Sequence, residues 1–143
     1  MGTRSTIRFI EKYENRETQL VNIYQQFDGY IEGVGYELAK WLINKTIVNG
    51  FVGNDEKNNA NGIGCLAAQF IKDLKKHIGG LYIVGSTNAQ EYNYDVIIDA
   101  RQIGRVNDIA LIRISKYDEK APVFIGRPSE LLTFKEPEDD DAA

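Results

Sequence analysis

Alternating apolar and polar positions open the chain and predict a β-hairpin. In residues 5–13, Ile7 and Phe9 alternate with polar neighbours, which is the two-residue period of a strand. A polar turn over residues 14–18 follows, and residues 19–27 resume the same alternation. Two such segments joined by a short polar turn predict an antiparallel hairpin.

The period then changes from two residues to that of a helix. Apolar side chains recur every three or four positions from residue 31 to about residue 44, which predicts an amphipathic helix. Residues 46–53 form a short apolar connector, and the asparagine-rich residues 54–61 are expected to be an exposed loop. A second amphipathic helix is predicted from Cys65 to about His77, with the Gly79-Gly80 pair ending it.

Strand patterns return in the last third of the chain. Three strands are predicted at residues 81–84, 92–100 and 109–117. A short edge strand around residues 123–125 follows, and then a turn or short helix at residues 129–132.

The grouping of these elements predicts the fold class. Strands and helices occur in separate runs with no alternation between them, which favours the α+β class. We therefore expect a mostly antiparallel sheet in the order β-β-α-α-β-β-β, with two helices packed on one face. Adjacent Ile97 and Ile98 indicate that their strand is buried on both faces near its centre. The length of the chain suits one domain, which we place at residues 1–135.

The charge is distributed unevenly along the chain. The formal net charge is −4, but five acidic residues lie in the last eight positions. Without them the chain carries 17 basic and 16 acidic residues, so the folded part is nearly neutral. Neutrality argues against binding of duplex nucleic acid, which favours a basic surface. Residues 136–143 are predicted to be a disordered acidic tail.

Composition also narrows the chemistry. One cysteine rules out an internal disulfide framework, and one cysteine with one histidine argues against a His/Cys zinc site. A carboxylate site for magnesium or calcium stays open although no calcium-loop spacing appears, and we expect neither a metal nor a cofactor. No apolar run approaches the roughly 20 residues that span a membrane, so no membrane partner is expected. The N-terminus lacks the apolar segment of a secretory signal, and the lone cysteine suits a reducing compartment such as the cytoplasm.

Two glycine-rich helix starts are the best candidates for a binding site. Gly33-x-Gly35 and Gly62-x-Gly64 each precede or begin a predicted helix. Such turns leave backbone N–H groups unshielded, and these donors suit a phosphate or carboxylate. Neither string has the spacing of a dinucleotide fingerprint or a P-loop. Tight turns also use glycine for purely structural reasons, and that alternative stays open.

Charged and aromatic residues lie beside the first of these turns. The hairpin brings Arg4 and Ser5 toward Asp28, so Arg4 and Asp28 either form a structural ion pair or leave Arg4 to bind an anion. Tyr30 and Tyr94 are candidates for stacking on a ligand, although aromatic residues in strands usually fill a core.

Candidates for catalysis are weak. His77 lies among lysines at the predicted helix end, and Cys65 has no second histidine or other base suggested near it. Asp95 and Asp99 share a strand face but would lie about 13 Å apart, too far for a pair of acting carboxylates. The chain is therefore expected to be non-enzymatic, and a small hydrolase or nuclease, dependent on a metal or on His77, is the third hypothesis.

Short strings along the first two thirds of the chain form a recognisable set: Gly-Thr-Arg-Ser at residues 2–5, Tyr-Gln-Gln-Phe-Asp-Gly-Tyr at 24–30, Gly-Val-Gly at 33–35, and the segments 61–70 and 91–94. Together they resemble a family of small proteins encoded by phages and large DNA viruses. The likeness covers roughly residues 2–100. It implies a viral protein that acts inside an infected cell, and it supplies no activity and no site residues.

The leading hypothesis is a viral counter-defence protein that binds and sequesters an anionic, nucleotide-like small molecule without turnover. Its expected ligand-binding residues are those discussed above: Arg4, Ser5, Asp28, Tyr30, Gly33, Gly35, Gly62, Gly64 and Tyr94. The alternative is a protein–protein interaction module that blocks a host protein or forms part of a virion, through a strand edge near residues 123–125. A homo-oligomer is compatible with either hypothesis.

Overall fold

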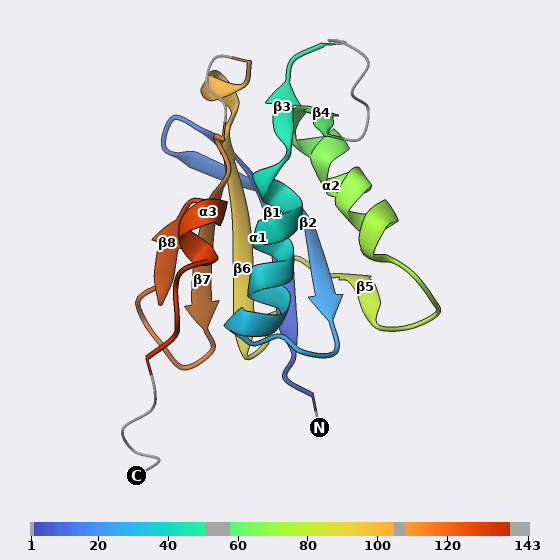
Figure 1. Cartoon of the computed structure of the whole chain (residues 1–143), viewed down its shortest axis with the longest axis vertical. Coiled ribbons are helices and arrows are strands. Elements are labelled where there is room, and N and C mark those ends of the chain that lie inside the picture. The colour runs from blue at the N-terminus through green and yellow to red at the C-terminus, as the bar shows by residue number, and fades with distance from the viewer. Residues whose placement is uncertain (1, 51–57, 105–107, 138–143) are drawn as a thin grey trace.

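The computed structural model describes residues 2–50, 58–104 and 108–137 (Figure 1). The strands are β1 (Ser5–Tyr13), β2 (Arg16–Gln25), β3 (Thr46–Val48), β4 (Asn59–Asn61), β5 (Leu81–Val84), β6 (Tyr92–Asp99), β7 (Leu111–Lys116) and β8 (Phe124–Gly126). The helices are the π-helical turn η1 (Ile31–Gly35), α1 (Tyr36–Ile43), α2 (Gly62–Leu74), the 3-10 turn η2 (Ala100–Gln102) and α3 (Pro128–Leu131). The predicted α+β class is confirmed.

One mixed sheet organises the molecule. Its six strands lie in the order β5-β2-β1-β6-β7-β8, and the neighbouring strands are antiparallel except for the parallel pair β1 and β6. The predicted hairpin is confirmed, with Ile7 opposite Ile23 and Phe9 opposite Val21. A register shift after Phe9 marks a bulge in this hairpin. The sheet is thus mostly antiparallel, as the grouping of strands predicts.

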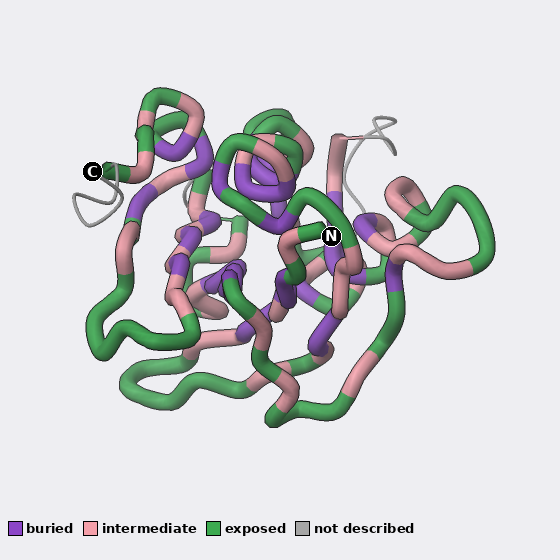
Figure 2. The backbone as a smooth tube through the Cα atoms, turned by 90° about the horizontal axis from the view of Figure 1, so that it is seen from below, coloured by how far each residue is buried: buried purple, intermediate pink, exposed green. Residues whose placement is uncertain are grey.

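Helices α1 and α2 cover one face of the sheet (Figure 1). The ring of Phe70 on α2 lies 5.4 Å from that of Phe9 on β1 and 5.1 Å from that of Trp41 on α1. Trp41 also donates a 2.8 Å hydrogen bond from Nε1 to Asp73 Oδ2, which joins the two helices. Figure 2 shows the buried positions along the strands and the sheet-facing side of the helices. Burial of each large apolar side chain contributes about 1.5–3 kcal/mol.

The opposite face of the sheet carries polar side chains along much of β1, β2 and β6 and is crossed by a loop. Because β5 and β6 run parallel with two strands between them, residues 85–91 must pass over β2 and β1. Asn22 Nδ2 donates to the carbonyl oxygens of Gly85 and Asn88, both at 2.9 Å, and Arg8 Nη2 donates to Asn88 at 3.0 Å. These bonds replace the apolar contacts that hold the other face.

A charged network continues across this polar face. Arg113 contacts Asp95 at 3.0 Å and Glu17 at 2.9 Å, and Arg8 lies 3.8 Å from Asp95. Burial raises the pKa of Asp95, although Arg113 and Arg8 act in the opposite direction. The burial of β6 on both faces is confirmed at its centre, where Ile97 and Ile98 are both buried.

The connection between the helices contains structure that the pattern did not predict. β3 and β4 pair in parallel, and Ile47 and Ala60 from the two strands join the core. Ala60 is buried, so the expectation of an exposed loop is wrong at this residue. Residues 51–57, which complete the predicted connector and loop, lie outside the described residues.

The second helix is shifted toward the N-terminus. It spans Gly62–Leu74, whereas the apolar period predicted Cys65 to about His77. Lys75 adopts an extended backbone, and the Gly79-Gly80 pair, with φ of +82° and +79°, turns the chain into β5. His77 therefore lies in the turn after the helix.

The C-terminal segment returns to the sheet and to α1. Tyr36 donates a 2.5 Å hydrogen bond to the carbonyl oxygen of Phe134. The carboxylate of Glu136 accepts from Tyr92 at 2.6 Å and from Lys116 at 2.9 Å. Glu136, the first residue of the predicted acidic tail, is therefore held against the domain. Residues 138–143 of that tail lie outside the described residues.

Candidate ligand-binding site

The turn that opens the helical layer is built from close backbone contacts. Asp28 has a φ of +60°, which is unusual for a residue with a side chain, and its carbonyl oxygen accepts a 2.8 Å bond from the N–H of Val34. A Cβ on Gly33 would collide with that same oxygen. Gly29 donates a 2.9 Å bond to Thr3, and a Cβ on Gly29 would lie 2.8 Å from Cβ of Ser5. Glycine is therefore required at both positions by packing.

A buried tyrosine supports this turn from the sheet. Tyr94 is fully buried, and its hydroxyl donates a 2.6 Å hydrogen bond to the carbonyl oxygen of Gly29. A Cβ on Gly35 would lie 3.2 Å from the Tyr94 ring. Burial raises the pKa of Tyr94, so the hydroxyl stays neutral as a donor. Tyr94 and Gly35 thus serve the core beneath the turn.

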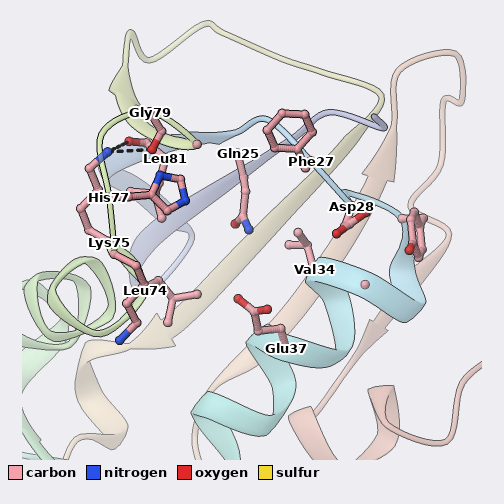
Figure 3. Close-up of a pocket in the computed structure, with 14 residues that line it drawn as sticks. Gln25, Phe27, Asp28, Val34, Glu37, Leu74, Lys75, His77, Gly79 and Leu81 are labelled. Carbon is pink, nitrogen blue, oxygen red and sulfur yellow. Dashed lines mark hydrogen bonds between the residues drawn. The ribbon is translucent and has the colours of Figure 1, made fainter. Parts of the chain in front are cut away.

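A cavity of about 290 Å³ lies where the start of the first helical segment meets the turn after α2 (Figure 3). We call it the turn cavity. Its lining comprises Gln25, Phe27, Asp28, Tyr30, Gly33, Val34, Glu37, Leu74, Lys75, Lys76, His77, Gly79, Gly80 and Leu81. The two walls meet because α1 and α2 run in opposite directions, which places the start of one beside the end of the other (Figure 1).

The two walls differ in charge. Asp28 and Glu37 lie on the first wall, and Lys75, Lys76 and His77 lie on the second. Lys75 is engaged within its own wall, since its Nζ donates to the carbonyl oxygens of Gly79 at 2.9 Å and Leu81 at 3.0 Å. Lys76 is exposed and is accessible to a ligand. His77 is also exposed, and its Nδ1 lies 2.9 Å from the carbonyl oxygen of Ile78, which leaves Nε2 accessible.

Aromatic and amide groups complete the cavity. The side chains of Phe27 and Tyr30 line it and are 55% and 41% exposed, so both rings offer a surface to a ligand. Figure 3 shows Gln25 between the His77 wall and the Asp28 wall. The buried Oε1 of Gln25 has no hydrogen-bond partner in the described part of the chain. An unpaired buried polar atom is uncommon in folded proteins.

The structure brings together three of the nine expected ligand-binding residues. Asp28, Tyr30 and Gly33 line the turn cavity. Gly62 and Gly64 begin α2 at the far end of the helical layer, so the two glycine-rich helix starts do not share a site (Figure 1).

Arg4 and Ser5 lie on the other side of the turn. Ser5 is buried, while Arg4 is exposed and lines a second hollow. The hairpin does bring the two segments together, but no ion pair joins Arg4 to Asp28 among residues 2–50. The predicted ion pair is therefore not formed in these residues, and binding of an anion by Arg4 stays a prediction.

Sequence reasoning missed most of the second wall. The apolar period places Lys76 on the solvated side of the second helix, and the sequence offers His77 only as a weak candidate for catalysis. Gln25 falls in the predicted second strand and Glu37 in the predicted first helix, and neither is predicted as a site residue. The signal that could have found this wall is the Gly79-Gly80 pair, which returns the chain toward the sheet beside the strand that ends at Gln25.

Comparison of the chain with protein-family models, with curated proteins and with solved structures finds no match. In the described ranges, no helix is long and apolar enough to cross a membrane. Those same residues contain no group of three or more His, Cys, Asp or Glu side chains placed to hold a metal ion.

Proposed function

We propose that the protein binds an anionic, nucleotide-like small molecule in the turn cavity and holds it without turnover. The observation that carries this proposal is the combination of exposed aromatic rings, an exposed lysine and carboxylates around one small cavity. Lys76 suits a phosphate, since a cationic donor forms strong hydrogen bonds to phosphate oxygens, and His77 adds a polar ring beside it. Asp28 and Glu37 suit ribose hydroxyl groups, and Phe27 or Tyr30 suits the face of a base.

The size of the cavity limits the ligand. A volume of about 290 Å³ is at the lower end of the range for small-molecule sites. It matches one nucleotide unit better than a cofactor with several rings. The resemblance to phage and large-virus proteins supplies the biological part of the proposal, in which the bound molecule is a host defence signal removed from the cytoplasm of an infected cell.

Native mass spectrometry of the protein purified from infected cells tests this function first. We expect a released compound that absorbs near 260 nm and has a phosphate-bearing mass. If the protein purified from infected cells shows only the mass of the ligand-free chain, sequestration is contradicted.

Titration of the purified protein with nucleoside monophosphates tests the residues. We expect Lys76→Glu to weaken binding by about tenfold or more, because a charge-assisted contact becomes repulsive. Lys72→Glu is the matched control, since Lys72 is an exposed lysine of α2 that does not line the cavity. Equal effects of the two substitutions would show that only net charge matters and would reject the site.

A second candidate function rests on the edge strand β8. Ile125 on this strand is 57% exposed, and among the described residues β8 has a neighbouring strand only on its β7 side. An exposed edge with an apolar side chain can pair with a strand of another protein. Under this hypothesis a defined host or virion protein co-purifies with the wild type and is lost with Ile125→Lys. Retention of that protein by the variant would contradict a β8 interface.

A further inference from the structure

A second hollow adjoins the turn cavity at the end of the sheet where β1 and β6 begin. We call it the strand-end hollow. Its volume is about 1050 Å³, and four segments line it: residues 2–4, 26–27, 89–92 and 116–119. Phe27 lines both this hollow and the turn cavity. The two spaces therefore share one aromatic wall.

Phe27 has one side toward each of the two spaces. Its ring is 55% exposed and lies across the turn cavity from His77 (Figure 3). On the other side it rests against the N-terminal segment, because a Cβ on Gly2 would lie 2.8 Å from Cδ1 of Phe27. Arg4 follows two residues later and lines the strand-end hollow. The backbone of a cationic residue, Arg4, therefore lies close to Phe27.

The groups in the strand-end hollow suit a second nucleoside and a bridging phosphate. Arg4 is exposed and forms no ion pair within the described ranges, so its guanidinium is free to meet a phosphate. The ring of Tyr117 is 74% exposed and can stack on a base. Glu91, Asp118 and Glu119 also line the hollow and can accept hydrogen bonds from hydroxyl and amino groups.

The other cation of this hollow is already engaged. Lys116 is paired with Glu136 at 2.9 Å, and Tyr92 donates to the same carboxylate. Asp118 and Glu119 follow Lys116 within three residues and line the same hollow, so they disfavour a second phosphate at that end. The anionic part of a ligand is therefore directed to the Arg4 end, beside Phe27.

We propose, building on the proposed function, that the ligand is a dinucleotide. One nucleoside occupies the turn cavity and the other occupies the strand-end hollow. The bridging phosphate lies by Arg4, and Phe27 separates the two bases. This arrangement uses both spaces and gives Arg4 a role that the mononucleotide site alone does not.

Isothermal titration of the full chain with ribonucleoside monophosphates and with 5′-phosphorylated linear dinucleotides tests this proposal. We expect the best dinucleotide to bind at least about tenfold more tightly than its component mononucleotides, because the second half binds intramolecularly. Arg4→Gln should remove most of that advantage, because the bridging phosphate loses its cationic partner. Arg16→Gln is the matched control, since Arg16 is an exposed arginine that lines neither space.

The outcomes separate the two proposals. If mononucleotides bind and dinucleotides bind no more tightly, the dinucleotide inference is overturned and the turn-cavity function stands. If neither binds, the proposed function falls and the inference falls with it. If dinucleotides bind more tightly but Arg4→Gln and Arg16→Gln behave alike, the second half of the ligand does not lie by Arg4, and the assignment of the strand-end hollow is wrong. Circular dichroism of Arg4→Gln confirms that a loss of binding is not a loss of fold.

Discussion

At the scale of single residues, the shape of the turn cavity depends on a glycine that has no side chain. Gly33 approaches the carbonyl oxygen of Asp28 so closely that a methyl group has no space there. The same oxygen already accepts the N–H of Val34, which ties the loop before η1 to the π-helical turn. Asp28 is held with a positive φ by these contacts, and its carboxylate is thereby placed on the cavity wall.

The first prediction compares two identical substitutions in the two glycine-rich strings. We expect Gly33→Ala to lower the free energy of unfolding by about 1–3 kcal/mol, because the new methyl group forces the backbone apart. Gly64→Ala should raise it by up to about 1 kcal/mol, because a Cβ there meets no atom within 4 Å and alanine favours the helix. Urea unfolding midpoints measure both. Similar midpoints for the two variants would show that Gly33 has more room than its contacts indicate.

At the scale of elements, two different kinds of force hold the two faces of the sheet. Helices α1 and α2 bury apolar side chains on one face, whereas hydrogen bonds fasten the loop of residues 85–91 on the other. That loop ends at β6, and Gln90 and Glu91 border the strand-end hollow. Its attachment therefore connects the packing of the sheet to the shape of a proposed ligand site.

The second prediction tests this attachment at Asn22. The substitution Asn22→Asp keeps the size of the side chain but replaces its donor with a carboxylate that faces two carbonyl oxygens. We expect a loss of about 1–3 kcal/mol at neutral pH, because two carbonyl oxygens lose their donor and face a buried charge, a cost that Arg8, opposite Asn22 in the hairpin, offsets in part. The loss should shrink in acid, because the new carboxyl group becomes neutral.

Asn15→Asp is the control, since Asn15 is exposed in the hairpin turn. Its effect should stay within about 0.5 kcal/mol. Hydrogen exchange should quicken in residues 85–91 of Asn22→Asp and in no other loop. Uniform quickening across the sheet would mean that Asn22 acts on global stability alone.

At the scale of the whole molecule, local patterns predict the elements and not their meeting points. Alternation at Ile7 and Phe9 identified β1, because a strand half-buried in a sheet repeats every two residues. The apolar stripes identified both helices for the same kind of reason. No local pattern predicts that α1 and α2 run antiparallel. This arrangement places Glu37 and His77 on opposite walls of one cavity.

The two glycine strings illustrate the limit. Gly33-x-Gly35 and Gly62-x-Gly64 are alike as sequence, yet the first lies at the cavity and the second lies beside β4 at the opposite end. The C-terminal boundary of the folded domain is a second case in which local sequence does not predict a contact. Acidic composition assigned Glu136 to the tail, but two partners distant in sequence, Tyr92 and Lys116, hold its carboxylate.

The third prediction concerns this C-terminal attachment. A chain that stops after Thr133 loses the packing of Phe134 on Phe124, with ring centres 4.9 Å apart, and the hydrogen bond from Tyr36. It also loses Glu136. We expect the melting temperature to fall by about 5–10 °C. A chain that stops after Pro137 keeps all these contacts and should melt within about 2 °C of the full chain. Equal losses in the two shortened chains would place the stabilising contacts beyond Pro137.

The same pair of chains makes a distinct prediction for Tyr92 at high pH. Burial first, and the hydrogen bond to Glu136 second, raise the pKa of Tyr92 to about 12. The folded state therefore keeps a proton that the unfolded chain releases near pH 10, so this tyrosine makes stability fall as the pH rises from about 10 to about 12. Without Glu136 the pKa should move down and that window should narrow. Absorbance titration at 295 nm of both chains, each with and without Tyr92→Phe, isolates this group. An unchanged Tyr92 pKa in the chain that stops after Thr133 would mean that burial alone sets it.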